Sequence, residues 1–296
     1  MSELTQLIGQ LVHAPTAADN KYTRGVLGFV TGSNAYPGAA LLGVAAAEAI
    51  GVGMVEYFGP QRVQDLLLVE HPQVVASVSV AGARAQAWVL GSGVEVPRVS
   101  AQSDASEADQ NIDDFTQAAN VRAAAYSQGA IAVVDAGAIA LLDYAKAING
   151  SLILTPHDGE LKRQFTRLQE TFRDSDFDSL DSRMITAQRA AQLLGQTVLL
   201  KGSITVIAHP FGETISVGPN SAHLATAGTG DLLAGILGAL AVANVAEVRK
   251  SWLRVAKLAV LIHSVAAERA ALVGPAVAAA IPAQVSKILR EVALGA

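Results

Sequence analysis

Short apolar runs alternate along the chain with longer stretches whose apolar residues have helical spacing. Val26 to Thr31 is mostly apolar and leads into the turn-rich stretch Gly32 to Gly38. An alanine-rich stretch follows from Ala39 to Ala49, and Gly53 to Phe58 is the next apolar run. Because a short, nearly continuous apolar run is typical of a strand buried on both faces, this part predicts a β–turn–α–β unit.

The same alternation continues to the end of the chain. Further strands are predicted at Val74–Val80, Gln86–Leu90, Ile131–Asp135, Ser151–Thr155, Thr197–Lys201, Thr205–Ala208 and Glu213–Val217. Helices are predicted from Ser2 up to Pro15, at Ile112–Ser127, Ala138–Ala147 and Met184–Leu194, and after Asp231. Ser100–Asp114 and Arg173–Ser182 are polar and acidic, which predicts loops.

This order of elements predicts one α/β domain over residues 1–296, with a mainly parallel, doubly wound sheet and helices on both faces. No linker rich in Pro, Gly or Ser divides the sequence. The polar turns Gly32–Gly38, Gly91–Gly93 and His157–Glu160 each follow a predicted strand. They are therefore expected together at the carboxyl edge of the sheet, where ligands bind in such folds.

Composition narrows the class of protein. Hydrophobic residues make up 51% of the 296 residues and charged residues 16%, which argues against a disordered chain. The net charge of −5, without a basic cluster, argues against nucleic acid or an anionic membrane as partner. There is no cysteine, no leader-like start at Met1, and no uncharged run of the roughly 20 residues that span a membrane. We expect a soluble cytoplasmic protein, and the apolar content favours an oligomer.

The run Ala225-Thr226-Ala227-Gly228-Thr229-Gly230-Asp231 predicts a glycine-rich turn that leads into a helix. Without a Cβ, Gly228 and Gly230 let the backbone approach a ligand closely. The first amides of a helix lack partners within it, so those of Gly228, Thr229 and Gly230 can form an anion hole for a phosphate. Asp231 would then be the base for a hydroxyl that attacks a phosphoryl group. The alternative is ordinary helix capping, since Asp is a preferred N-cap residue.

A second candidate, Lys201-Gly202-Ser203-Ile204-Thr205, follows a predicted strand. A lysine that leaves a strand end beside a glycine can reach one phosphate, and the hydroxyls of Ser203 and Thr205 can bind another. The alternative is a surface lysine in a β-turn.

A third candidate, His157-Asp158-Gly159-Glu160, lies at a strand-to-helix turn. His157 can hydrogen-bond a substrate, and Glu160 can hold a water on Mg²⁺. The alternative is a turn histidine with a capping carboxylate in the first helical turn. The acidic run Asp174-x-Asp176-x-Asp178 lacks the glycine and the final glutamate of a calcium loop, so we interpret it as solvated charge.

Four segments together resemble the ADP/ATP-dependent NAD(P)H-hydrate dehydratases of the ribokinase-like superfamily. They are Gly32-Ser33-Asn34-Ala35-Tyr36-Pro37-Gly38-Ala39-Ala40, Leu154-Thr155-Pro156-His157-Asp158-Gly159-Glu160-Leu161, Val198-Leu199-Leu200-Lys201-Gly202 and Ala225-Thr226-Ala227-Gly228-Thr229-Gly230-Asp231. The last segment alone marks the superfamily, whereas the first two are typical of the dehydratase branch. The resemblance extends from Val26 to the last helices.

That family removes water from NADH or NADPH that has been hydrated on the nicotinamide ring, and it spends ADP or ATP. The resemblance therefore implies a lyase, an ADP-dependent (S)-NAD(P)H-hydrate dehydratase, in which the ring hydroxyl is phosphorylated and phosphate then leaves. Asp231 would take the hydroxyl proton, and the amides of Gly228 to Gly230 would hold the transferring phosphoryl group.

The resemblance also assigns binding residues. The nucleotide contacts would be Lys201, Gly202, Ser203, Ile204, Thr205, Thr229 and Gly230. The residues of the hydrate pocket would be Ala39, Ala40, Gly93, His157 and Asp231. Mg²⁺ is implied by phosphoryl chemistry, with no direct protein ligand assigned, and a homotetramer is implied by the family. The chain starts almost at the kinase-like part, so no epimerase domain is expected in front of it.

The late run His263-Ser264-Val265-Ala266-Ala267-Glu268 departs from the family's His-Gly-x-Ala-Gly-Asp, and two further departures lie near the expected pocket. Ser92 and Glu95 replace parts of a Gly-Pro-Gly-Leu-Gly turn, and Gly137 replaces the second carboxylate of an Asp-Ala-Asp run. They leave two alternatives open. One is a kinase of a vitamin or another small alcohol that uses the same base, and the other is a nucleotide-binding relative that has lost catalysis.

Overall fold

The computed structural model describes residues 2–97, 105–168, 170–275 and 277–295. Its strands are β1 Val26–Val30, β2 Met54–Phe58, β3 Val75–Ser77, β4 Ala87–Leu90, β5 Ala132–Val134, β6 Leu152–Leu154, β7 Thr197–Leu200, β8 Thr205–Ala208 and β9 Thr214–Val217. They form one sheet in the order β3-β2-β1-β4-β5-β6-β7-β8-β9. The neighbours from β3 to β7 pair in parallel, and β8 and β9 continue the sheet antiparallel.

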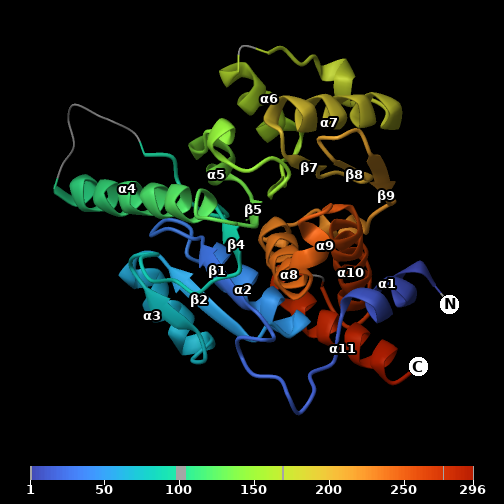
Figure 1. Cartoon of the computed structure of the whole chain (residues 1–296), viewed down its shortest axis with the longest axis horizontal. Helices are drawn as coiled ribbons and strands as arrows, with labels where there is room; N and C mark the ends of the chain where they lie inside the picture. Colours follow the sequence, from blue (N-terminus) through green and yellow to red (C-terminus); the bar gives the residue numbers. More distant parts are fainter. Residues whose placement is uncertain (1, 98–104, 169, 276, 296) are drawn as a thin grey trace.

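Helices cover both faces of this sheet. Their bounds are α1 Glu3–Leu11, α2 Gly38–Ile50, α3 Gln61–Glu70, α4 Ala105–Ala125, α5 Gly137–Leu141, α6 Asp158–Arg167, α7 Leu180–Leu194, α8 Thr229–Ala243, α9 Val245–Val248, α10 Leu253–Ala271 and α11 Ile281–Ala293. In Figure 1, α4 to α7 lie on one side of the strands, and α1, α8, α10 and α11 lie on the other. The predicted mainly parallel, doubly wound sheet is confirmed.

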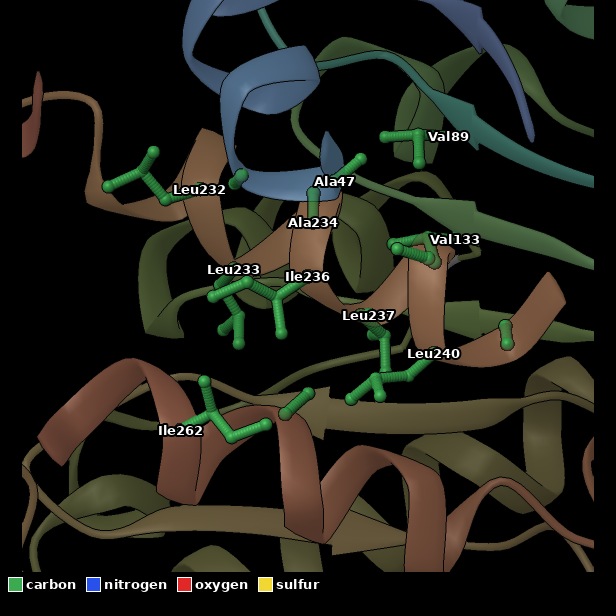
Figure 2. Close-up of a cluster of buried hydrophobic side chains, with 14 of the residues drawn as sticks. Ala47, Val89, Val133, Leu232, Leu233, Ala234, Ile236, Leu237, Leu240 and Ile262 are labelled. Atoms are coloured by element: carbon green, nitrogen blue, oxygen red, sulfur yellow. The ribbon is translucent and has the colours of Figure 1, made fainter. Parts of the chain in front are cut away.

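Successive strand residues belong to two different cores. Phe29 packs in the core under α2, α8 and α10, whereas its neighbour Val30 packs in the core under α4 to α7. Val133 and Val134 on β5 divide in the same way. Figure 2 shows the first core, in which leucine and isoleucine side chains of α8 lie between the strands and α10. Because both of their faces are buried, β1 and β5 have no polar residues, as the apolar runs predict.

Two glycines bring α2 and α8 into close contact. A Cβ on Gly235 of α8 would lie 2.1 Å from the carbonyl oxygen of Gly43 on α2. Only glycine permits this approach of the two backbones. The contact holds α8 across the sheet, and its first residues lie beside Lys201 at the carboxyl end of β7, since a Cβ on Gly230 would be 3.6 Å from Lys201 Nζ.

Both predicted acidic loops are partly wrong. Helix α4 begins at Ala105, so residues 105–114 are helical, while residues 100–104 lie outside the described residues. In the second loop, residues Asp174–Phe177 form a 3-10 turn and α7 begins at Leu180. Helix α7 begins within the predicted loop because Ser179 is its N-cap, and the Ser179 hydroxyl accepts the Ser182 N–H.

Some predicted elements are shorter in the structure. The helix predicted at Ala138–Ala147 is the single-turn α5 followed by a 3-10 turn at Tyr144–Lys146, which the Asp143 side chain caps. The first helix ends at Leu11, before Pro15. None of the helices in the described residues has the length and apolar content to cross a bilayer.

Candidate active site

Polar side chains from the ends of three neighbouring strands lie close together. Asp135 follows β5, Thr155 follows β6 and Lys201 follows β7. Lys201 Nζ lies 3.0 Å from Asp135 Oδ1 and 3.6 Å from Glu160 Oε2 in the first turn of α6. The carboxyl edge of the sheet thus carries a lysine between two carboxylates, as expected for a ligand site in this architecture.

Asp135 is the buried centre of this group. Only 3% of the residue is exposed, and it accepts hydrogen bonds from Ser92 Oγ at 2.9 Å and Thr155 Oγ1 at 2.7 Å besides that from Lys201. These three hydrogen bonds replace the contacts with water that the buried carboxylate has lost. Ser92, a departure from the family pattern, therefore has a defined structural partner.

Lys201 is held in its charged form. Burial of the ammonium opposes its charge, but the carboxylates of Asp135 and Glu160 outweigh that effect and raise the pKa of Lys201. The ammonium therefore stays a fixed positive charge at the strand edge. The alternative of a freely solvated surface lysine is wrong, since the side chain is 22% exposed and carries two ion pairs.

The glycine-rich turn ends in αL geometry at Gly228, the N-cap of α8, with φ of 89° and ψ of −9°. Within the described ranges, no side chain caps this helix end. In the described residues, the amides of Gly228, Thr229 and Gly230 have no backbone partner, so they can bind an anion. Asp231 is the third residue of the helix and not its N-cap, which contradicts the capping alternative.

The carboxyl of Asp231 has the electrostatics of a base. Burial, and then the charge of Asp135, raise its pKa, the charge of Lys201 lowers it, and the net result is a pKa of about 6. A general base works best when its pKa is near the working pH. Asp231 would therefore be mostly ionised at neutral pH yet more basic than an ordinary aspartate.

A cavity of about 390 Å³ opens beside this turn. Five of the predicted nucleotide residues contribute to its wall together with Lys201, namely Gly202, Ser203, Thr205, Thr229 and Gly230. Ile204, also predicted there, is not part of the wall. Leu224, Leu233 and Val260 supply apolar surface. The cavity thus joins an apolar chamber to the anion-binding turn, an arrangement that suits a nucleotide base with its phosphates.

Three polar residues of this cavity, Asn220, Ser221 and His263, are not among the predicted site residues. Asn220 Nδ2 donates to the Gly202 carbonyl at 3.0 Å and to Thr205 Oγ1 at 2.9 Å, which fixes the β7–β8 turn. His263 of α10 is buried, and burial lowers its pKa to about 4, so its ring is neutral. The Gly218-Pro219 pair before Asn220 signals a turn, but nothing in the local sequence connects that turn or α10 with Lys201.

Other side chains hold the loops in place. Thr229 Oγ1 donates to the carbonyls of Leu224 and Thr226, so its hydroxyl stabilises the glycine-rich turn. Arg183 Nη1 of α7 donates to both carboxylate oxygens of Asp158, and Arg183 Nη2 donates to the carbonyl of Lys201. A Cβ on Gly202 would lie 2.6 Å from Arg183 Nη2, which explains a glycine at that position.

The predicted hydrate-pocket residues are only partly together. Gly93 and Ala39 are in contact, since a Cβ on Gly93 would lie 2.7 Å from Ala39 Cβ, and φ of +69° also favours glycine there. Ala40 is completely buried in the core. Ala39 itself is 8% exposed. Gly137 has no room for the family's carboxylate, because a Cβ would lie 2.0 Å from the Val94 carbonyl oxygen.

His157 and Glu160 form a capping box at the start of α6. The His157 side chain accepts the Gly159 N–H at 3.1 Å, and Glu160 Oε2 accepts the His157 N–H at 2.9 Å. The capping alternative is therefore confirmed, but it leaves Glu160 beside Lys201. In the acidic run, Asp176 accepts the Arg173 N–H and Asp174 pairs with Lys162, a capped turn with solvated charge.

Comparison with known proteins identifies the family of this chain. Residues 27–290 match the family model described as NAD(P)H-hydrate dehydratase. The chain belongs to the NAD(P)H-hydrate dehydratase family. A bifunctional NAD(P)H-hydrate repair enzyme of Mycobacterium tuberculosis is 36% identical over 76% of this chain and 42% of its own length. The chain thus spans about two fifths of the length of such curated relatives.

Two further matches come from shorter relatives. An ADP-dependent (S)-NAD(P)H-hydrate dehydratase of Neisseria meningitidis is 28% identical over 75% of this chain and 70% of its own length. The crystal structure of an ADP/ATP-dependent NAD(P)H-hydrate dehydratase from Bacillus subtilis, co-crystallised with ATP/Mg²⁺, matches with a TM-score of 0.74 at 23% identity, over 97% of both chains. The expected ribokinase-like fold is confirmed by such matches.

Proposed function

We propose that this chain restores NADH or NADPH from its hydrate, with ADP or ATP as the phosphoryl donor. The observation that carries the proposal is Asp231, a carboxyl with a raised pKa placed next to unpartnered helix amides and the Lys201 ammonium. The family of this chain, and the activities for which its relatives are named, support the same reaction.

The first step is phosphoryl transfer to the ring hydroxyl. The nucleotide base would lie in the cavity beside Leu224 and Val260, and its terminal phosphate on the amides of Gly228 to Gly230. Asp231 takes the hydroxyl proton as the oxygen forms a bond to phosphorus, and the bond from phosphorus to the leaving nucleotide breaks. Lys201 offsets the negative charge that spreads over the phosphoryl oxygens.

The second step is elimination. The bond between the ring carbon and the phosphate oxygen breaks, a proton leaves the neighbouring ring carbon, and the ring double bond is restored. The products are the reduced dinucleotide, inorganic phosphate and AMP or ADP, so atoms and charge balance. His157, Ala39 and Gly93 are the residues proposed to line the ring.

Mg²⁺ would reach this site bound to the nucleotide. The described residues hold no group of three or more His, Asp or Glu side chains that could bind a metal ion by themselves, and Mg²⁺ is usually held by substrate phosphates and one or two carboxylates while it keeps several waters. Bound to the nucleotide, the ion would neutralise phosphate charge. Glu160 is the residue proposed to contact it through water.

An absorbance assay tests the proposal. Hydrated NADH, ADP and Mg²⁺ are mixed with the protein, and the absorbance of the reduced nicotinamide is followed. Its return, with one phosphate released per dinucleotide, supports the proposal. A stable phosphorylated product without elimination would favour a kinase, and nucleotide binding without turnover would favour a relative that has lost catalysis.

The remaining parts of the proposal concern the whole protein. Residues 1–296 would act as one dehydratase domain, in the cytoplasm and as a homotetramer, in accordance with the family resemblance. Exposed apolar side chains such as Leu272, Val273 and Leu294 are compatible with an oligomer. Light scattering after gel filtration measures the assembly directly.

A further inference from the structure

The amide side chain of Asn220 uses only half of its hydrogen-bonding capacity within the chain. Its Nδ2 donates to the Gly202 carbonyl at 3.0 Å and to Thr205 Oγ1 at 2.9 Å. A side-chain amide nitrogen carries two hydrogens, so both donors are in use. Its Oδ1 accepts no hydrogen bond from the described residues. Towards a ligand, the side chain of Asn220 is therefore an acceptor only.

The contacts of Asn220 also fix which way its amide points. The Gly202 carbonyl oxygen can accept a hydrogen bond but cannot donate one, so the amide atom that faces it is the nitrogen. A flipped amide would bring two acceptor oxygens together. The Asn220 backbone N–H donates to the Ser203 carbonyl at 2.7 Å, which holds the residue against the turn between β7 and β8. Asn220 Oδ1 is thus held in place before a ligand binds, which lowers the entropy cost of binding.

The free oxygen of Asn220 is open to the nucleotide cavity. Asn220 is half-buried and lines this cavity, and of five cavities in the described residues it lines no other. The sealed side-chain oxygens and nitrogens that lack a partner in these residues belong to Thr31, Gln117, Gln164, Thr197 and His263. Asn220 Oδ1 is not among them, so this unpartnered atom has accessible surface. A hydrogen-bond donor on a ligand in the cavity can therefore reach it.

A donor on a nucleotide is either a ribose hydroxyl or an amine on the base, and the position of Asn220 decides between them. Its partners Gly202 and Ser203 directly follow Lys201 in the chain. Lys201 Nζ lies beside the first turn of α8, where the phosphate is proposed to bind. The apolar wall proposed for the base comes from other elements, the turn before α8 and helix α10. Because the ribose joins the phosphates to the base, an acceptor next to the phosphate end of the cavity meets the ribose.

We propose that Asn220 binds the ribose of the nucleotide and selects ribonucleotides over deoxyribonucleotides. Asn220 Oδ1 accepts a hydrogen bond from one of the two neighbouring ribose hydroxyls. A sugar that lacks this hydroxyl leaves Oδ1 without a donor in the occupied cavity and therefore binds more weakly. The proposal rests on the proposed function, because it concerns the phosphoryl donor of that same reaction. Asn220 determines specificity and takes no part in the chemical steps.

Calorimetric titration in the presence of Mg²⁺ tests this contact with ADP, 2′-deoxy-ADP and 3′-deoxy-ADP. The wild-type protein should bind one of the two deoxynucleotides about 3- to 10-fold more weakly than ADP, the effect of one neutral hydrogen bond. Asn220→Ala should abolish that difference, because the acceptor is gone. Asn220→Leu keeps the volume of the side chain and should give the same result if alanine loosens the turn. A residue that only holds the turn would, when replaced, weaken all three nucleotides equally and leave the difference intact.

Asn244→Ala is the matched control. Asn244, at the opposite end of α8, also donates two hydrogen bonds from Nδ2, to the carbonyls of Leu11 and Leu240. It lines none of the same five cavities in the described residues. Its replacement removes a comparable pair of structural hydrogen bonds, and it should leave the preference for ADP over the deoxynucleotide unchanged.

The 5′-diphosphate of purine riboside, which has no amine on its base, separates the ribose contact from a base contact. Its affinity relative to that of ADP should be the same in the wild type and in Asn220→Ala. A change in this ratio would assign Asn220 to the base and overturn the inference. Equal affinities of the wild type for ADP and both deoxynucleotides, or a difference that survives both Asn220 variants, would also overturn it and leave the proposed function standing. A wild-type protein that binds none of these nucleotides would overturn both.

Discussion

The ammonium of Lys201 lies 3.0 Å from the carboxylate of Asp135, although 65 residues separate them in the chain. This pair joins the ends of two strands, β5 and β7, under the first turn of α8. Asp231 interacts with both charges, since Asp135 raises its pKa and Lys201 lowers it. Burial is the main cause of the raised pKa of this carboxyl, and the ion pair outside its own helix adjusts it further.

Asp231→Asn should reduce kcat about 10²- to 10⁴-fold, the contribution of a general base, and leave nucleotide affinity nearly unchanged. Amides on the turn and the apolar chamber bind the nucleotide, and neither is altered by this change. Single-turnover kinetics with a separate ADP titration check both parts. A loss below tenfold would mean that the carboxyl is not the base.

The same variant should be more stable than the wild type above pH 7. The pKa of Asp231 is about 6 in the fold against an ordinary value of 3.8 for aspartate, so the folded chain binds more protons between these pH values. Stability conferred by the neutral carboxyl is then lost as pH rises through that window. Urea unfolding should show a gain of about 2–3 kcal/mol at pH 8 and almost none at pH 4.

The protonation of Asp231 should also make kcat/KM depend on pH. As pH falls through about 6, protonation of Asp231 should lower kcat/KM, which gives an acid limb with an apparent pKa of about 6. Lys201→Met should move the carboxyl pKa upward, because the lysine charge lowers it. Carbon-13 NMR titration of aspartate carboxyls measures this shift independently of turnover. An unchanged titration would place Lys201 too far from Asp231 to matter.

Lys201→Met should also destabilise the protein, by about 3–5 kcal/mol, because it leaves the Asp135 carboxylate buried without its cation. Asp135→Asn in the same chain should recover much of that stability. Nucleotide affinity should stay low in both variants, since the ammonium is absent from each. Recovery of affinity in the double variant would show that Lys201 acts on the nucleotide only through the fold.

Gly230→Ala should weaken ADP binding without unfolding the protein. The added methyl group would lie 3.6 Å from Lys201 Nζ, an ordinary contact, yet it would occupy the space where a phosphate meets the first amides of α8. Gly9→Ala, a helical glycine with open space around it, is the matched control. Equal ADP affinities in the two variants would exclude a phosphate site at this turn.

The sequence predicts those features that arise from local patterns. Short apolar runs predict the buried strands and their alternation with helices. The glycine-rich run predicts the αL turn at Gly228. The start of α7 at Leu180 was missed because the Ser179 cap lies within a run of charged and hydroxyl residues that also suits a loop.

Features formed by distant segments could not be predicted in the same way. Asp135 was assigned as the end of a strand, but its bonds to Ser92, Thr155 and Lys201 require the parallel order of β4 to β7. Asn220 enters the site through contacts that no spacing in the chain encodes. Local sequence therefore gives the parts of this site, and the sheet order gives their assembly.

The most direct measurement follows one oxygen atom. Hydrated dinucleotide labelled with ¹⁸O in the ring hydroxyl is turned over with ADP, and the products are analysed by mass spectrometry. If Asp231 activates that hydroxyl to attack the phosphoryl group on the α8 turn, the label should appear in inorganic phosphate. Label that appears in water, with unlabelled phosphate, would contradict phosphorylation of the ring and with it the role given to this site.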